Sequence, residues 1–155
     1  MPPSPVRAKR LTLADRAQAR ALFTLMTDVF EEPPRPLSDA YLEQLLGRED
    51  FWAYAALDPD GALVGGITAH VLPMTRSEQR ELFIYDLAVR EDRQRQGIGR
   101  CLIAAVSDDA AAQGIGVMFV PADNDDDHAL AFYRAVGGAA QPVTLFVFER
   151  ESTRR

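Results

Sequence analysis

The chain has 155 residues, of which 47% are hydrophobic and 26% are charged, with a net charge of −6. These values are typical of one globular domain, and we expect residues 1–155 to form it, with flexible ends at 1–5 and 151–155. The acidic balance argues against nucleic acid as a partner and favours a cationic one. No segment approaches the roughly 20 apolar residues of a membrane-spanning helix, so no membrane partner is expected.

Two features favour a cytoplasmic location. Residues 1–10 lack the apolar core of a secretory signal, and the single cysteine, Cys101, excludes an internal disulfide framework. Cys101 lies in an apolar helical pattern, where the expected role is a buried structural thiol. The histidines and cysteine form no cluster with metal-ligand spacing, so no metal is expected.

The first half of the chain predicts a strand, two helices and a hairpin. Residues 6–11 predict the strand, and Thr12 with Asp15 three residues later marks the start of a helix that ends near Val29. A proline-rich stretch follows, and Ser38 caps a short second helix. The apolar stripe of the first helix is expected to contain Ala17, Ala21, Leu22, Leu25 and Val29. The second helix is expected to end at Leu46. A hairpin follows, with strands at residues 51–57 and 63–72 that are joined by a turn at residues 58–61.

The second half predicts alternating strands and helices. An apolar run at residues 82–89 predicts a central strand, and a helix from residue 97 or 98 to 113 follows a glycine-bearing turn. A short strand at 115–120, a helix between Asp127 and Gly137, and a last strand at 143–149 complete the pattern. This order predicts an α/β fold in which helices cover the faces of a mixed sheet.

The turn at residues 94–99, with the sequence Gln-Arg-Gln-Gly-Ile-Gly, carries the clearest chemical signal. A helix N-terminus offers unpaired backbone N–H groups and a positive dipole end, which suit a phosphate. Gly97 and Gly99 let the backbone approach an anion closely. Positive charge is expected from Arg93, Arg95 and Arg100. Neither the Gly-Lys-Ser/Thr of a nucleotide P-loop nor the third glycine of a dinucleotide fingerprint is present, so a different pyrophosphate cradle is indicated.

This strand and turn resemble motif A of the GNAT superfamily, the acetyl-CoA-dependent N-acetyltransferases. Gln94, Gly97 and Gly99 fit the pattern Arg/Gln-x-x-Gly-x-Gly/Ala, and the predicted element order matches the GNAT fold along essentially the whole chain. The resemblance therefore implies a mostly antiparallel mixed sheet, with a splayed parallel pair at its centre and helices on both faces.

The resemblance extends to one branch, the type I aminoglycoside 3-N-acetyltransferases (gentamicin and fortimicin acetyltransferases). The runs that carry it are residues 71–73, 84–89, 95–98, 122–123, 126–127 and 131–133. Three residues depart from the expected pattern. Gln94 stands where the branch usually has arginine, Asp125 stands at an expected glycine, and Asp126 replaces the superfamily's usual asparagine.

The resemblance implies acetyl-CoA as cosubstrate. The backbones of Leu87, Ala88 and Val89 would pair with its pantetheine arm, as an added strand would, and one of their N–H groups would polarise the thioester carbonyl. Plain strand core is the alternative role for these three residues, and both roles are compatible. The pyrophosphate would lie against Arg95, Gln96, Gly97, Ile98, Gly99 and Arg100.

The resemblance also implies a role for a tyrosine, and the chemistry of a protonated amine acceptor suggests roles for several acids. Tyr133 matches the position that commonly protonates the departing thiolate, and a tyrosine remains a proton donor at neutral pH. Asp123 and Asp86 are candidates for the base that takes a proton from the amine. A core position for Tyr133, a structural hydrogen bond for Asp86 and a helix N-cap for Asp126 remain open. Contacts to a cationic acceptor are expected from Asp123, Asp125, Asp126, Glu31 and Glu32.

The sequence thus predicts a cytoplasmic N-acetyltransferase that transfers acetyl directly to an aminoglycoside's 3-amino group, a reaction typical of antibiotic resistance. Exposed sheet edges and the habit of the family favour a homodimer. Two alternatives remain. The acceptor could instead be a polyamine, another metabolite amine or a protein amine, or the protein could be a non-catalytic acyl-CoA-binding regulator.

Overall fold

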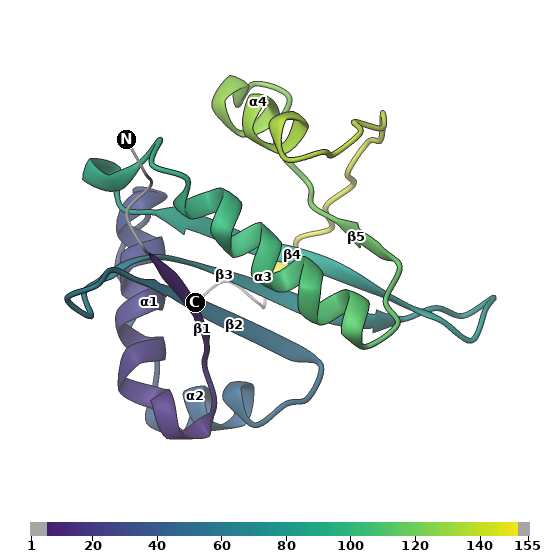
Figure 1. The fold of residues 1–155 in the computed structure, drawn as a ribbon. Coiled ribbons are helices and arrows are strands. Elements are labelled where there is room, and N and C mark those ends of the chain that lie inside the picture. Colours follow the sequence, from purple (N-terminus) through teal and green to yellow (C-terminus); the bar gives the residue numbers. More distant parts are fainter. Residues whose placement is uncertain (1–5, 152–155) are drawn as a thin grey trace. The chain divides into compact units, whose positions relative to one another are not determined.

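The computed structural model describes residues 6–151, which form two compact units that divide after Pro121. The first unit holds a five-stranded sheet with helices, and the second holds one helix and the C-terminal segment (Figure 1). The predictions for residues 1–5 and 152–155 lie outside the described residues. The single-domain organisation of residues 1–155 stays a prediction.

The first unit confirms the predicted strands and helices, with ends that differ by a few residues. Its strands are β1 (Arg7–Arg10), β2 (Phe51–Leu57), β3 (Leu63–Pro73), β4 (Arg80–Val89) and β5 (Val117–Phe119). Its helices are α1 (Arg16–Val29), α2 (Asp39–Leu46) and α3 (Ile98–Ala112), with short 3₁₀ turns at Leu13–Asp15 and Glu91–Arg93. The predicted caps are confirmed as well. Thr12 and Asp15 form a reciprocal capping box, and the Ser38 hydroxyl accepts from the backbone N–H of Tyr41.

The sheet has the order β1-β2-β3-β4-β5, antiparallel throughout except for the parallel pair β4–β5. Only Glu81–Phe83 of β4 pair with β5, whereas β4 itself continues to Val89. The second half of β4 therefore has a strand partner on one side only, as a splayed pair requires. Because no further strand follows β5 among residues 6–151, this pair lies at the edge of the described sheet.

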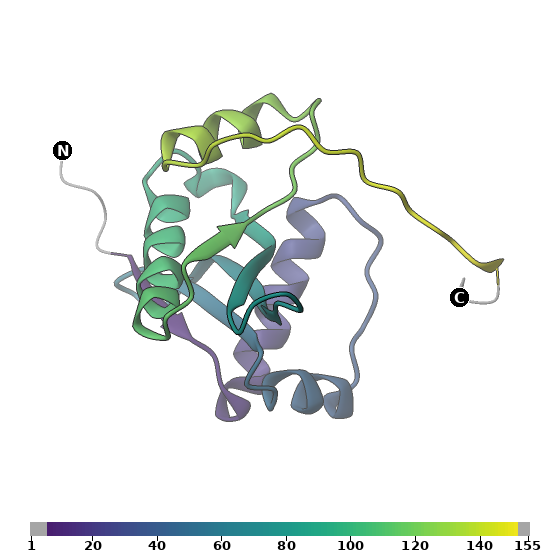
Figure 2. The ribbon, with the colours of Figure 1, turned by 90° about the vertical axis from the view of Figure 1, so that its right-hand side faces the viewer.

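Two apolar clusters cover the two faces of the sheet. One lies beneath α3 and includes Trp52, Ile67, Leu82 and Leu102, and the other lies beneath α1 and α2. Figure 2 shows α1 and α3 on opposite sides of the strands. The approach of α1 is close, because a Cβ added to Gly66 of β3 would lie 2.2 Å from a Leu22 methyl carbon. A larger residue at this position would separate the helix from the sheet.

The buried stripe of α1 differs from the predicted one. Ala19, Leu22 and Met26 are buried, whereas Ala17 and Ala21 are exposed. Leu25 and Val29 are half-buried against the same cluster. The helix buries the row i, i+3, i+7 against the sheet, which a sequence rich in alanine on several sides does not single out.

The second unit confirms one predicted element and contradicts another. The predicted helix is present as α4 (Asp127–Ala135), and Gly137 follows it with a φ of 103°. Residues 143–149, predicted as a last strand, form no strand in the structure. They run as extended, exposed chain at the C-terminal end (Figure 2). A strand needs a neighbouring edge to satisfy its backbone N–H and C=O groups, and the described residues of the second unit contain no other strand that could supply one.

Candidate functional site

A β-bulge interrupts β4 where the predicted site begins. Thr68 of β3 pairs with Asp86, but the next residue, Ala69, pairs with Ile84, so Tyr85 is the extra residue. A bulge leaves the additional residue unpaired, re-aims side chains and disturbs the ladder locally. Tyr85 and Asp86 therefore lie at the one irregular point of the β3–β4 pairing.

Asp86 is half-buried, and its carboxylate makes no hydrogen bond or ion pair with any residue that the structure describes. Burial raises the pKa of this carboxyl above its ordinary value, and the negative charge of nearby Glu32 raises it further. Glu32 lies in the segment after α1, so its charge acts on Asp86 from an element far away in the sequence. A partly desolvated carboxylate without a partner is unfavourable unless a cation or a proton joins it. The structural hydrogen bond considered for Asp86 is not formed.

Aromatic rings line the sheet beside Asp86. Tyr85 is exposed and meets His70 edge-on at 5.5 Å between ring centroids. The row continues through the pairs Phe51–His70, Tyr85–Phe83 and Phe83–Phe119. Burial lowers the pKa of His70, which favours its neutral form. His70 thus packs between the rings of Phe51 and Tyr85, and the exposed ring of Tyr85 borders the site.

The backbone of the second half of β4 has one open side. The Arg90 N–H donates to the Val64 carbonyl on β3, and alternate residues of a strand direct their backbone groups to opposite sides. The backbone groups of Leu87 and Val89 therefore point away from β3, where β5 has already ended. Ala88 is paired with Gly66 and directs its carbonyl towards β3. Of the three residues predicted to pair with pantetheine, Leu87 and Val89 have the accessible backbone.

The turn before α3 has the geometry of an anion cradle. Arg95 and Gly97 both adopt left-handed conformations, with φ of 63° and 82°, and no side chain caps the helix that begins at Ile98. The first N–H groups of a helix have no partner within the helix. A Cβ added to Gly97 would meet no atom within 4 Å, so the approach to these groups is open. The residues present thus fit a phosphate or pyrophosphate group.

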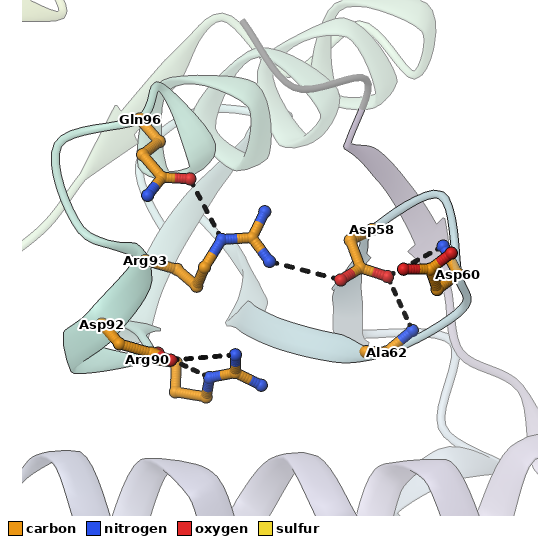
Figure 3. A network of polar contacts seen from close by, with 7 residues as sticks. All are labelled: Asp58, Asp60, Ala62, Arg90, Asp92, Arg93 and Gln96. Carbon is orange, nitrogen blue, oxygen red and sulfur yellow. Dashed lines mark hydrogen bonds and ion pairs between the residues drawn. The ribbon is translucent and has the colours of Figure 1, made fainter.

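Arg93 has a structural role that the sequence did not reveal. It reaches from the cradle to the β2–β3 turn, where its guanidinium donates to Asp58 at 3.2 Å, and it also donates to the Gln96 side chain at 3.0 Å (Figure 3). Asp58 in turn accepts from the backbone N–H groups of Asp60 and Ala62. Arg93 was expected to add positive charge for an anion, but its charge is already matched by Asp58. It tethers the cradle instead.

Gln94 also bonds within the protein, because its side-chain amide donates to the Val89 carbonyl at 3.1 Å. Its side chain therefore connects the end of β4 to the cradle rather than replacing the arginine charge that the family motif usually supplies. One of the backbone acceptors on the open side of β4 is thereby satisfied. The sequence offered no signal for this contact, since it depends on how the turn folds back.

An acidic hollow of about 600 Å³ lies between α1 and the end of β4. Its acidic lining comes from Asp28, Glu31 and Glu91. Gln94, which belongs to the turn that forms the cradle, also lines the hollow. Arg90, which also lines it, is paired with Asp92 through two hydrogen bonds (Figure 3). The acids of the hollow thus remain as an attractive surface for a cation.

The remaining predicted site residues lie in the second unit. The Asp126 carboxylate accepts from the Ala129 N–H and caps α4, which confirms the structural alternative considered for it. Asp123 and Asp125 are exposed just before this cap. Tyr133 is half-buried on α4 with its ring 5.2 Å from that of Phe132. Their roles in catalysis and acceptor binding stay predictions.

Two further observations concern the part of the chain that the structure covers. No helix within it is long and apolar enough to cross a membrane. Within the same range, no group of three or more His, Cys, Asp or Glu side chains is arranged to hold a metal ion.

Comparison with protein families and solved structures gives a consistent result. Residues 16–137 match the model of the acetyltransferase (GNAT) family. An aminoglycoside acetyltransferase, meta-AAC0020 from an uncultured soil metagenomic sample, is 36% identical in its trehalose complex, with a TM-score of 0.89 and coverage of 94% of this chain and 97% of that one. In its sisomicin complex the same protein gives 34% identity and a TM-score of 0.90, over the same shares of both chains.

A more distant structure shows the fold alone. The aminoglycoside N-acetyltransferase AAC(6′)-Iy, solved in complex with CoA, is 17% identical, with a TM-score of 0.80 and coverage of 95% of this chain and 96% of that one. A search of curated proteins found no match. The matched family model covers most of the chain, and it includes β4, the bulge and the cradle.

Proposed function

Because the chain belongs to the acetyltransferase (GNAT) family, we propose that it transfers acetyl from acetyl-CoA to the 3-amino group of an aminoglycoside. The observation that carries the choice of a cationic acceptor is Asp86, a half-buried carboxylate that has no hydrogen-bond or ion-pair partner among residues 6–151 and is influenced by the negative charge of Glu32. The 36% identity to an aminoglycoside acetyltransferase supports the substrate class. The 3-amino position rests on the sequence resemblance described above.

Asp86 and Glu32 suit the first requirement of the reaction, which is to bind an ammonium group and then neutralise it. Burial, and to a lesser degree the charge of Glu32, raises the pKa of Asp86, and a positive charge close to Asp86 would offset both effects. Because that pKa is raised, Asp86 is a stronger proton acceptor than an ordinary aspartate. We assign Asp86 the role of base, acting directly or through a water, and Glu32 that of a neighbouring anchor. Asp123 is the second candidate base.

Backbone groups of β4 supply the second requirement, a polarised carbonyl. When bound, acetyl-CoA provides the acetyl group as a thioester. The Leu87 or Val89 N–H, directed to the open side of the strand, would donate to its carbonyl oxygen. Tyr133 would donate its hydroxyl proton to the departing sulfur, a role that rests on its match to the family motif.

The cradle supplies the third requirement, which is a fixed position for the cosubstrate. Backbone N–H groups at residues 96–99 would hold the pyrophosphate, with charge from Arg95 and Arg100. The Arg93–Asp58 ion pair connects this turn to the β2–β3 turn. On the acceptor side, contacts are assigned to Glu31, Glu32, Asp123, Asp125 and Asp126, because an aminoglycoside carries several positive charges.

The proposal also includes the organisation, location and biological role of the enzyme: one domain over residues 1–155, a homodimer in the cytoplasm, and a role in antibiotic resistance.

The proposed activity is tested by measuring CoA release from acetyl-CoA with gentamicin, fortimicin and sisomicin, and in parallel with spermidine and simple primary amines. We expect release with the aminoglycosides and, by NMR of the product, acetyl on N3. Acetyl on another amine would overturn the 3-amino assignment alone. Release only with the other amines would overturn the aminoglycoside assignment.

A further inference from the structure

The cradle before α3 contains backbone strain that neighbouring contacts must offset. Arg95 has a φ of 63°, in the left-handed region that favours glycine. A residue with a side chain keeps such a conformation only where its surroundings hold it there. Two side-chain contacts flank this position: Arg93 donates to the Gln96 side chain at 3.0 Å, and Gln94 donates to the Val89 carbonyl at 3.1 Å. The shape of the cradle therefore depends on where these side chains are anchored.

Arg93 connects the cradle to a distant turn. Its guanidinium donates through one nitrogen to Gln96 and through another to Asp58, which lies 35 residues earlier in the turn between β2 and β3. Figure 3 shows the guanidinium between these two side chains. The side chains of Arg93 and Asp58 are only 17% and 13% exposed. Because water and salt screen a partly buried pair less than a surface pair, this contact is suited to hold the two turns together.

Asp58 is itself fixed by its own turn. One carboxylate oxygen accepts from the backbone N–H groups of Asp60 and Ala62, at 3.0 and 2.9 Å, and the other accepts from Arg93. The backbone N–H of Asp58 also donates to the Ala62 carbonyl. The Ala62 N–H, with a further contribution from the Arg93 guanidinium, holds the pKa of Asp58 below its usual value. Asp58 is thus a charged and immobilised anchor for the arginine.

We propose that Asp58 is a positioning residue for the cosubstrate: by holding Arg93, it keeps residues 94–97 in the conformation that leaves their backbone N–H groups open to the pyrophosphate. The inference rests on the proposed function, which places acetyl-CoA at this cradle. Geometry and charge make opposite predictions here. If only charge mattered, Asp58 would weaken anion binding, because it neutralises Arg93. If position matters more, removal of Asp58 weakens anion binding although it frees a positive charge.

The variant Asp58→Asn separates these two effects. Asparagine retains an oxygen for the N–H groups of Asp60 and Ala62, but its amide nitrogen cannot accept from Arg93. The dissociation constant of CoA is measured by calorimetry, with no acceptor present. We expect it to rise about tenfold, because it increases in proportion as the binding-competent conformation loses population. Unchanged or tighter binding would overturn the inference alone. Absence of CoA binding by the unmodified protein would overturn the proposed function as well.

Asp92→Asn is the matched control. It removes the same charge from the same segment, but Asp92 pairs only with Arg90, two residues away, and their side chains are 67% and 42% exposed. This pair connects no second element to the cradle. We expect the dissociation constant of CoA to change less than about twofold, as is typical of an exposed ion pair. An effect equal to that of Asp58→Asn would contradict a specific role for Asp58.

A double variant tests whether Asp58 acts through Arg93. Asp58→Asn and Arg93→Gln change the net charge in opposite directions, yet each should weaken CoA binding by a similar factor. Because both break one contact, the double variant should bind CoA no more than about twofold more weakly than either single variant. Multiplying effects would show that Asp58 acts independently of Arg93 and would overturn the inference.

Steady-state kinetics distinguish positioning from a general loss of structure. In Asp58→Asn, KM for acetyl-CoA should rise about tenfold, whereas kcat and KM for the acceptor amine should change less than about twofold. A fall in kcat with KM for acetyl-CoA unchanged would indicate a smaller fraction of folded enzyme and would contradict the positioning role.

Discussion

The two units of the chain differ in how much apolar surface they bury. In the first unit, two clusters of buried side chains fill both faces of the sheet. No described residue after Ile115 is buried, although the second unit contains five large apolar side chains between residues 143 and 148. The first unit is thus stabilised by its own core, whereas the second exposes most of its large apolar side chains. The half-buried Asp86 lies in the self-sufficient unit, and the predicted proton donor Tyr133 lies in the other.

Asp86→Asn should have the largest effect, because it removes the proposed base from the well-packed unit while preserving size. We expect kcat/KM for an aminoglycoside to fall about 10²–10⁴-fold, with the affinity for acetyl-CoA unchanged by calorimetry. Asp108→Asn, at an exposed position of α3, is the matched control and should leave both values unchanged. Retention of near-normal kcat/KM would transfer the role of base to Asp123.

Core truncation compares the stability of the two units directly. Leu102→Ala removes a fully buried side chain under α3 and should lower the free energy of unfolding by about 2–5 kcal/mol. Leu145→Ala, at an exposed position of the C-terminal segment, should change it by less than about 0.5 kcal/mol. Urea unfolding measures both. A large cost for Leu145→Ala would show that this side chain is buried in the folded protein.

Two variants of Asp126 separate its role as a helix cap from the effect of its negative charge. Asparagine is as good an N-cap as aspartate, so Asp126→Asn keeps α4 while Asp126→Ala costs about 1 kcal/mol of helix stability. If Asp126 also contacts the acceptor, Asp126→Asn should raise KM for an aminoglycoside about twofold to fivefold, the scale of an exposed ion pair. Steady-state kinetics and circular dichroism measure the two effects. An unchanged KM would leave Asp126 as a helix cap only.

The smallest expected effect is the pH dependence that Asp86 gives to stability. Its pKa is raised above the ordinary value of 3.8, so the folded protein holds this proton more tightly than the unfolded chain. The resulting stabilisation is present below about pH 3.8 and is lost as pH rises through the folded pKa. The melting temperature of Asp86→Asn relative to the unmodified protein should therefore rise from acid to neutral pH. A difference that is constant with pH would contradict the raised pKa.

The sequence was sufficient to predict the structural features that depend on residues close together in the chain. The capping of Thr12 and Ser38, the ends of most strands and the glycine-bearing turn before α3 all arise from contacts within a few residues. The cradle was predictable for the same reason, since Gly97 and the helix start at Ile98 are local. The family resemblance added the expected roles of Leu87, Val89 and Tyr133, which no local pattern supplies.

The tertiary structure decided what depends on residues far apart in the chain. It brought Asp86 under the influence of the charge of Glu32, it turned Arg93 from an expected anion ligand into a partner of Asp58, and it gave residues 143–149 no strand conformation. The physical reason is that a charge or a strand acquires its role from the partner that packing brings to it. Sequence spacing shows that residues 143–149 have the composition of a strand, but only an available sheet edge can make them one.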